Sequence, residues 1–258
     1  MALEKIHRIH FSPTGTTRTV VEAIAEEFEG EHVTWDMLRD VPETETEFGP
    51  NELVIAGMPV YAGRIPGLCG AMLSKFRGRG TPTIATVVYG NRDYDDALLE
   101  LKNVMEAGGF SVAGAGAFVA QHSIFPLVGA GRPDTKDLGT IADFARKCAY
   151  KIETAPAENL ASPEVKGNFP YKQPGSIPLA PSGNEKCNRC GACVALCPTR
   201  AIEASDPRRT DVSRCISCAA CIAICPQKAR AFRGFKYWLG GRAFRKKFTR
   251  RMEPEVFV

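Results

Sequence analysis

The stretches CNRCGACVALCP (residues 187–198) and CISCAACIAICP (residues 215–226) decide the fold of the C-terminal part of this 258-residue chain. Each stretch carries four cysteines at the same intervals and ends in proline, and the second follows the first after 28 positions. Eight of the ten cysteines lie between Cys187 and Cys225, so they mark a site and not a bias in composition. The sequence therefore predicts a duplicated half-domain that binds metal.

The length predicts a medium-sized domain followed by a small one. His7, Arg8 and His10 interrupt the first apolar run, so no signal peptide is expected. No apolar stretch is long enough for a membrane helix, and we expect no membrane association. The predicted location is the cytoplasm, where reduced thiols bind metal more often than they form disulfides. The sequence leaves the oligomeric state open.

The net charge of +4 is distributed unevenly. Residues 1–150 carry 14 Lys and Arg against 20 Asp and Glu, whereas residues 151–258 carry 19 against 9. Anionic groups bound by the chain would offset much of the positive charge. We therefore expect no nucleic acid as a partner.

The N-terminal part alternates short β-rich runs with longer helical stretches, which predicts βαβ units and an open, doubly wound parallel sheet. The expected strands are Lys5–Phe11, His32–Met37, Glu52–Gly57, Thr83–Tyr89 and Ser111–Gln121. The expected helices are Thr16–Glu29, Leu68–Phe76, Asp95–Ala107 and Asp134–Ile152.

The composition divides the chain into four segments. Residues 1–150 form the α/β domain, and 151–184 hold six of the 18 prolines and are predicted to be an extended linker. Residues 185–232 contain the cysteine repeat. Residues 233–258 form a basic tail rich in aromatic residues, with an amphipathic helix expected from about Trp238 onward. We expect Phe244 and Trp238 to dock this tail on the protein body.

The spacing C-x2-C-x2-C-x3-C-P resembles that of bacterial two-cluster ferredoxins, small α+β domains in which the fourth cysteine ligates the other cluster. The resemblance implies two [4Fe-4S] clusters. The first would be held by Cys187, Cys190, Cys193 and Cys225, and the second by Cys215, Cys218, Cys221 and Cys197. Zinc is the alternative, although zinc ribbons separate their two cysteine pairs by a longer gap. Iron binding would supply much of the folding free energy of so small a segment.

The segment after the first expected strand is rich in hydroxyl groups and runs directly into a helix. Hydroxyls and backbone N–H groups at a helix N-terminus can bind a phosphate, although such a turn is also an ordinary helix cap. The segment resembles the FMN phosphate loop of flavodoxins, which implies contacts from Ser12, Thr14, Gly15, Thr16 and Thr17.

Two later segments stand where flavodoxins place the loops around their flavin ring. The first resembles a flavodoxin loop through Pro59, Val60, Tyr61, Ala62, Gly63 and Arg64. The second resembles another through Tyr89, Gly90, Asn91, Arg92 and Tyr94. The resemblance implies that Tyr61 and Tyr94 cover opposite ring faces. It also implies that Arg64 stabilises negative charge on the reduced ring.

Together these features resemble an anaerobe family that fuses a flavodoxin-like domain, with a five-stranded sheet, to a two-cluster ferredoxin. The resemblance implies an electron-transfer protein that passes single electrons between the clusters and FMN, with a redox protein as partner. Two alternatives remain: a flavin-dependent reductase of a small organic substrate, and a redox sensor that signals through the basic tail. His122, Cys69 and Cys148 are expected to be structural.

Overall fold

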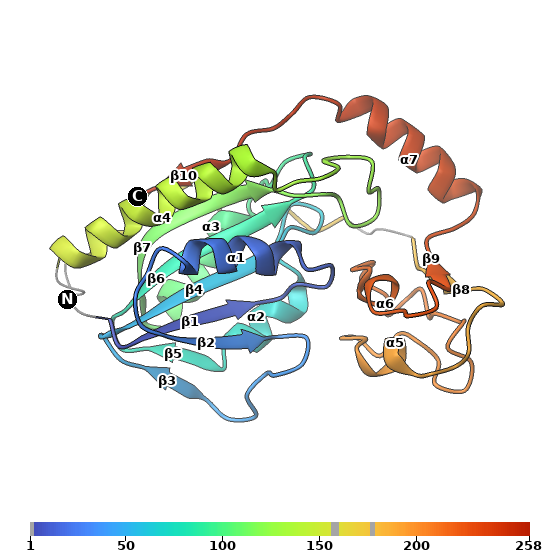
Figure 1. The fold of residues 1–258 in the computed structure, drawn as a ribbon, viewed down its shortest axis with the longest axis horizontal. Helices are drawn as coiled ribbons and strands as arrows, with labels where there is room; N and C mark the ends of the chain where they lie inside the picture. Colours follow the sequence, from blue (N-terminus) through green and yellow to red (C-terminus); the bar gives the residue numbers. More distant parts are fainter. Residues whose placement is uncertain (1–2, 156–159, 176–178) are drawn as a thin grey trace.

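The structure is a computed structural model that describes residues 3–155, 160–175 and 179–258. Its largest element is a six-stranded sheet in the order β10-β7-β6-β4-β1-β2 (Figure 1). Five strands are parallel, and β10 pairs antiparallel with β7 at one edge. The strands are β1 (Lys5–His10), β2 (Glu31–Asp36), β4 (Glu52–Pro59), β6 (Thr81–Tyr89), β7 (Phe110–Val119) and β10 (Glu255–Phe257).

The order of the parallel strands identifies the fold. Numbered along the chain among themselves, they lie in the order 2-1-3-4-5, which is the order of the flavodoxin-like doubly wound sheet. The connections change direction between β1 and β4, and a crevice forms at the carboxyl ends of strands at such a point. The predicted fold class is confirmed, and each strand and helix expected in the first 150 residues is present.

Two helices cover each face of the sheet (Figure 1). Leu53 and Ile55 of β4 point into the core under α1 and α4, whereas Val54 and Ala56 point into the core under α2 and α3. Because both faces are buried, the strands read as continuous apolar runs. The helices are α1 (Thr16–Ala25), α2 (Gly67–Leu73), α3 (Ala97–Ala107) and α4 (Thr135–Thr154).

A second, two-stranded sheet was not expected from the sequence. It pairs β3 (Thr46–Phe48) in parallel with β5 (Phe76–Gly78). The helix expected to reach Phe76 ends at Leu73 instead, because Phe76 is fully buried and its ring packs 5.9 Å from that of Phe48.

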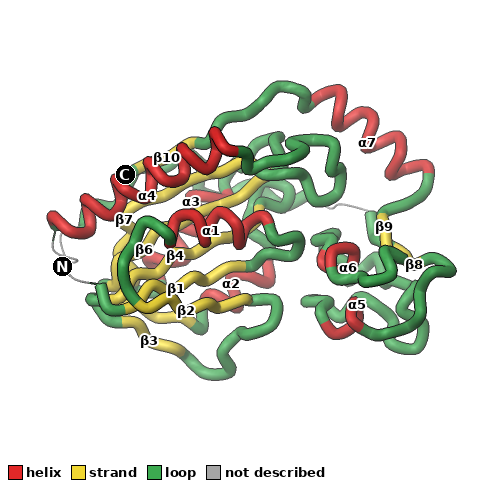
Figure 2. The backbone as a smooth tube through the Cα atoms, viewed as in Figure 1, coloured by secondary structure: helices red, strands yellow, loops and turns green. Residues whose placement is uncertain are grey.

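The C-terminal cysteine repeat folds into a small unit composed mostly of loops (Figure 2). Strands β8 (Ser182–Gly183) and β9 (Arg230–Ala231) pair antiparallel and bring its two ends together. Between them lie two short helices, α5 (Ala192–Ala195) and α6 (Ala220–Ala223), which are again 28 residues apart. The fold thus repeats with the period of the sequence.

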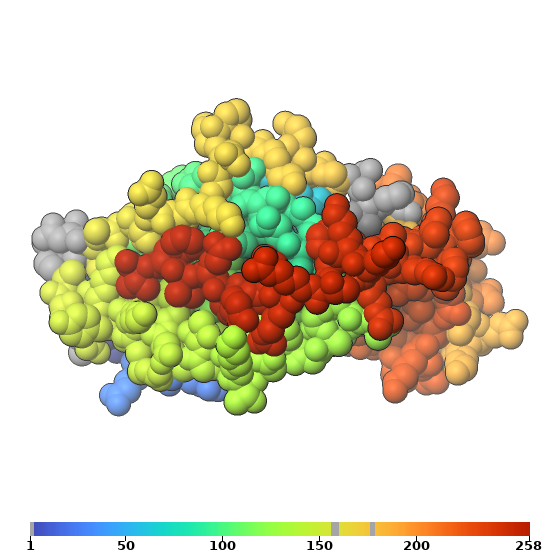
Figure 3. All heavy atoms as spheres, turned by 90° about the horizontal axis from the view of Figure 1, so that it is seen from above, coloured from blue at the N-terminus to red at the C-terminus, as the bar shows by residue number. Residues whose placement is uncertain are grey.

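The segments that flank this unit tie it to the α/β fold. Backbone N–H groups of Asn168 and Lys172 donate to the Asp96 carboxylate at 2.9 and 2.7 Å, which holds the preceding segment against α3. Residues 156–159 and 176–178 of the expected linker lie outside the described residues. After the unit, α7 (Phe235–Lys247) begins three residues before Trp238, and the tail continues along the surface beside α4 to β10 (Figure 3).

Among residues 3–155, 160–175 and 179–258, no helix has the length and apolar character needed to cross a bilayer. Near the expected segment ends at 150 and 185, α4 continues to Thr154 and β8 begins at Ser182, and the four-segment division stays a prediction.

Candidate functional site

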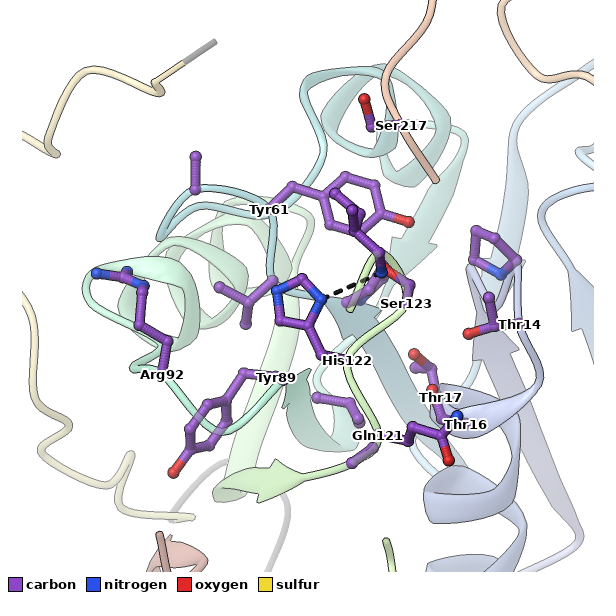
Figure 4. Close-up of a pocket in the computed structure, with 18 of the residues that line it drawn as sticks. Thr14, Thr16, Thr17, Tyr61, Tyr89, Arg92, Gln121, His122, Ser123 and Ser217 are labelled. Carbon is purple, nitrogen blue, oxygen red and sulfur yellow. Dashed lines mark hydrogen bonds between the residues drawn. The ribbon is translucent and has the colours of Figure 1, made fainter. Parts of the chain in front are cut away.

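A cavity of about 250 Å³ lies at the carboxyl ends of β1, β4, β6 and β7 (Figure 4). Eleven of the sequence-predicted flavin residues line it: Thr14, Thr16, Thr17, Pro59, Val60, Tyr61, Ala62, Gly63, Tyr89, Gly90 and Arg92. Three segments remote in sequence are therefore brought to one site. The far wall comes from the C-terminal half of the chain, through Ile216, Ser217 and Phe244.

The expected phosphate loop turns tightly into α1. Gly15 has a φ of 89° and precedes the helix, and its N–H donates to the Ser12 carbonyl oxygen at 3.3 Å. Ser12 Oγ accepts from the Arg18 N–H at 2.9 Å, so this side chain holds the loop in shape and does not line the cavity. Thr14, Thr16 and Thr17 face the cavity at the helix N-terminus (Figure 4), where the first turn carries no acidic residue. This donor set fits a phosphate monoester.

The loop that carries Tyr61 is a tight turn. The backbone groups of Tyr61 and Arg64 pair at 2.8 and 3.2 Å, and the two residues between them, Ala62 and Gly63, both have positive φ. A Cβ at Gly63 would collide with the Asp95 carboxylate, so this position requires glycine. The turn holds Tyr61, which is partly buried, in the cavity wall (Figure 4). Burial raises the pKa of the Tyr61 phenol, and the Cys218 and Cys69 thiols add to the rise.

Arg64 does not line the cavity, which corrects its expected role toward the flavin ring. Its guanidinium forms a two-point ion pair with Glu100, with both N–O distances at 2.7 Å, and lies 4.6 Å from the centre of the Tyr171 ring. The cation at the cavity is Arg92, which is paired with Asp95.

Some residues of the loop after β6 line the cavity, whereas others pack against the protein body. A Cβ at Gly90 would lie 2.5 Å from the His122 ring, so glycine lets these two segments approach. Asn91 turns away from the cavity: its amide donates to the Phe248 and Arg250 carbonyls at 3.1 and 2.8 Å, and its oxygen accepts from the Met252 N–H at 3.0 Å. Asn91 thus holds the tail, which corrects its expected contact with the flavin.

Tyr94 is also absent from the cavity wall. Its ring is 1% exposed, packs against Tyr89 and donates from its hydroxyl to Glu255 Oε2 at 2.8 Å. The expectation that it covers one flavin face is therefore wrong, because β10 of the tail holds the ring in the core.

His122 also lines the cavity, where no role was expected for it from the sequence (Figure 4). Its Nδ1 accepts from the N–H groups of Ile124 and Phe125 at 3.1 and 3.2 Å, so the ring proton sits on Nε2. Burial, with a contribution from Arg92, lowers the pKa of His122 to about 4. The ring is therefore a neutral donor at pH 7. Its place just after a parallel strand was the signal that could have identified it.

The first group of cysteines encloses a second, small cavity. Cys187, Cys190, Cys193 and Cys225 line it together, and the fourth comes from the other repeat. Cys190 is the one exposed cysteine. All ten cysteines lie within the described residues, and none forms a disulfide there.

The second group also combines both repeats. Burial raises the pKa of the Cys218 thiol to about 12, and the nearby Cys221, Cys197 and Cys215 thiols add to the rise. Metals bind the thiolate, so iron would have to displace this proton. These four cysteines are the expected ligands of the second cluster.

The backbone around both groups follows the internal repeat. The N–H groups of Ala201 and Ala229 donate to Cys197 Sγ and Cys225 Sγ, each at 3.3 Å. Left-handed backbone conformations also recur at 28-residue intervals, in the pairs Arg189 and Ser217, Gly191 and Ala219, and Arg200 and Lys228. Such N–H groups tune the reduction potential of iron-sulfur clusters.

Arg230 is a buried cation between the two groups, and its role there was not expected from the sequence. It is 2% exposed, lines the cavity of the first group, and its Nε has no hydrogen-bond partner among the described residues. Burial raises the pKa of the Cys193 and Cys221 thiols, and the charge of Arg230 opposes the rise in both. An orphaned N–H beside four thiols fits an anionic cluster.

A family model described as a 4Fe-4S dicluster domain matches residues 182–226. Solved structures similar to the N-terminal part include a flavodoxin from the domain Archaea, 16% identical over 58% of this chain and 99% of that one (TM-score 0.41). They also include apo NADH:FMN oxidoreductase EmoB, 17% identical over 60% and 92% of the two chains (TM-score 0.41). A Fusobacterium nucleatum flavodoxin mutant bound to flavin mononucleotide is 13% identical over 58% and 98% (TM-score 0.40). No curated protein matches the chain.

Proposed function

We propose that this chain, a flavodoxin-like fold joined to a 4Fe-4S dicluster segment, passes single electrons between two [4Fe-4S] clusters and an FMN. In this role it would couple low-potential donors to a flavin-dependent acceptor in the cytoplasm. When bound, each cluster carries one electron at a time, and FMN accepts one or two. The observation that carries the proposal is the shared wall between the two sites. Ile216 and Ser217, which stand between the second-group ligands Cys215 and Cys218, line the cavity of the flavodoxin-like fold.

The positions of the two cysteine groups support an order of transfer. The loop of the second group forms part of the flavin cavity, and Cys218 is close enough to Tyr61 to influence its phenol. The first group contains the exposed Cys190 and lies in a cavity that shares no lining residue with the flavin site. We therefore assign the first group to contact with an external donor and the second to exchange with the flavin.

The proposed FMN contacts follow from the shape of the cavity wall. Thr14, Thr16 and Thr17 would bind the phosphate at the N-terminus of α1, and Tyr61 would lie against the ring. The Nε2–H of His122 and the guanidinium of Arg92 would face its polar atoms. The eleven lining residues named above remain the proposed flavin contacts.

Anaerobic stopped-flow mixing of the reconstituted protein with dithionite, a reductant that needs no docking site, tests the proposal. We expect the cluster absorbance to bleach first and the flavin absorbance to follow. A Cys218→Ser variant, which lacks a ligand of the second cluster, should retain flavin but reduce it at least about tenfold more slowly. Cys148→Ser, which alters a buried thiol of α4, is the matched control. Clusters that bleach while the flavin stays oxidised would contradict the proposal.

A second candidate function is the reduction of a small organic substrate at the flavin. The polar side chains of Gln121, His122 and Ser123 in the cavity wall favour it, because a substrate needs donors beside the ring. Steady-state turnover with candidate acceptors separates the two functions: a reductase consumes substrate without a protein acceptor, whereas a carrier does not.

A further inference from the structure

Helix α7 and the loop after β7 form an open groove on the surface. The groove has a volume of about 620 Å³, and Phe125, Leu127, Trp238, Arg242, Arg245 and Lys246 are among the residues that line it. Tyr237 anchors the helix beneath it, through a hydrogen bond of 3.1 Å from its hydroxyl to the Ile124 carbonyl oxygen. The helix lies on the outside of the molecule (Figure 3), so the groove is open to a partner.

The apolar side chains around the groove are exposed to an extent that core packing does not explain. Trp238 and Leu127, which line the groove, are 57% and 69% exposed, and Phe235 and Leu239 of the same helix are 73% and 51% exposed. Clustered exposure of this kind marks an interaction site in a protein that is otherwise well packed. The expectation that Trp238 docks the tail on the protein body is therefore wrong, whereas Phe244 does dock it, 5.2 Å from the Phe125 ring.

The charge of this surface has one sign. Residues 233–252 contain eight Lys and Arg and no Asp or Glu. Among these cations, Arg251 alone has a carboxylate partner within the described part of the chain. The Arg242 guanidinium lies 5.9 Å from the Trp238 ring centre, which places charge directly beside the apolar groove. A partner must therefore offer carboxylates around an apolar side chain.

The groove lies one side-chain layer from the flavin cavity. Phe125 lines the groove, and its ring centre is 5.4 Å from that of His122 and 5.2 Å from that of Phe244. His122 and Phe244 both line the flavin cavity. A molecule in the groove would thus sit close enough to the proposed redox site to exchange electrons with it.

We propose that this groove is the docking site of a small acidic protein that carries one electron. Its carboxylates would face Arg242, Arg245 and Lys246, and an apolar side chain would sit beside Trp238. In each encounter one electron moves between this chain and the centre of the partner, so one is oxidised and the other reduced, with no atom transferred. A lipid surface is less suited, because it supplies no single protruding group to fill a concave groove. The docking site rests on the proposed electron-transfer function.

Isothermal titration calorimetry of the loaded full-length protein with an acidic plant-type [2Fe-2S] ferredoxin tests the proposal. We expect binding that weakens as salt is raised from 50 to about 200 mM, since opposite charges attract across the interface. Arg242→Glu combined with Arg245→Glu should weaken binding at least about tenfold, and Trp238→Ala should do so by a similar factor. Lys147→Glu, which reverses an exposed charge on α4, is the control and should leave binding unchanged.

Several outcomes would overturn the docking site. They are no binding of the ferredoxin, equal binding by the groove variants and the control, or binding that is indifferent to salt. Sedimentation of the protein with phosphatidylserine vesicles, lost in the same variants, would assign the groove to a membrane instead. Calorimetry measures docking without electron transfer, and internal stopped-flow transfer needs no partner. Failure of one proposal is therefore distinguishable from failure of the other.

Discussion

At the scale of single residues, Arg230 is a buried positive charge that lies close to both cysteine groups. Its buried guanidinium donates to the carbonyl oxygens of Pro181, at 2.7 Å, and Pro207, and to the Thr210 hydroxyl, while Nε stays without a partner among the described residues. A fixed positive charge between two anionic sites stabilises added electrons, because reduction makes a cluster more negative.

We therefore expect Arg230→Gln to lower the reduction potential of the clusters. The shift should be on the order of 60 mV, which is a tenfold change in a one-electron equilibrium. Potentiometric titration followed by electron paramagnetic resonance measures it. Arg230→Lys keeps the charge and should retain most of the wild-type potential. Unchanged potentials in the Gln variant would show that the guanidinium does not act on the clusters.

Tyr61 and Tyr94 give a matched pair of tyrosines for testing flavin binding. Tyr61→Ala removes an aromatic face from the cavity and should raise the dissociation constant of FMN about tenfold, or about 1.4 kcal/mol. Tyr94→Phe removes only the hydrogen bond to Glu255 and should leave FMN binding unchanged. Titration of the apoflavoprotein followed by flavin fluorescence measures both. Equal losses in the two variants would place the flavin elsewhere.

The pKa of His122 predicts how stability depends on pH in the flavin-free protein. The pKa falls from 6.5 in the unfolded chain to about 4 in the fold, so below pH 6.5 the unfolded chain binds a proton that the folded chain does not. The free energy of unfolding should therefore fall by up to roughly 3 kcal/mol as the pH falls from 6.5 to 4. Above pH 6.5, His122 should add nothing to the pH dependence of stability. Urea unfolding across this range should show a flatter profile for His122→Gln, and parallel profiles would refute the assignment.

At the scale of elements, local patterns were sufficient where an element buries its own apolar face. The strands and helices of the first 150 residues were predictable, because each buried strand is a continuous apolar run and each helix has apolar residues at helical spacing on the face that covers the sheet. β10 was not, because three residues carry no period and its partner β7 lies far away in sequence. That strand also explains the error at Tyr94, whose bond to Glu255 spans 161 residues. The role of Asn91 in holding the tail could not be predicted for the same reason, because its partners lie more than 150 residues away in sequence.

Asn91 is the main polar anchor of the tail and provides a test of its attachment. The residue is 5% exposed and makes three hydrogen bonds of 3.1 Å or less to the backbone between Phe248 and Met252. Asn91→Ala should therefore lower the free energy of unfolding by about 2 to 3 kcal/mol, measured in urea. Asn103→Ala removes a single bond to the Tyr171 hydroxyl and should cost about 1 kcal/mol. An Asn91 loss no larger than that of Asn103 would mean that the tail is held by other contacts.

At the scale of the whole molecule, the flavin cavity is built by parts of the chain that fold by different means. The flavodoxin-like part has two apolar cores, one on each side of its sheet, whereas Ala219 and Phe232 of the cysteine repeat belong to a small cluster that they share with Ile124 of the loop after β7. Metal must therefore contribute much of the stability of the repeat. The eight candidate ligand cysteines could be recognised in the sequence from their repeated spacing. The shared cavity wall at Ile216 could not, because no local pattern reports contact between two folded units.

Removal of iron should consequently weaken FMN binding. Without iron the repeat unfolds, and Ile216 and Ser217 no longer close the cavity. We expect the dissociation constant to rise about tenfold in the chelated protein, and by a smaller factor in loaded Ile216→Ala, which trims the same wall. Flavin fluorescence measures both. An FMN affinity that does not respond to iron would indicate that the two sites are independent.

The antiparallel strand at the edge of the sheet has a consequence for how the protein behaves in a cell. The chain leaves the flavodoxin-like part at the end of α4 and returns to it at β10, so the cysteine repeat is fastened on both sides. Because the repeat is attached at both ends, its effective concentration at the flavin site does not depend on how much protein the cell contains. A separate ferredoxin and flavodoxin lose contact on dilution, whereas here the internal exchange rate should be the same from nanomolar to millimolar protein.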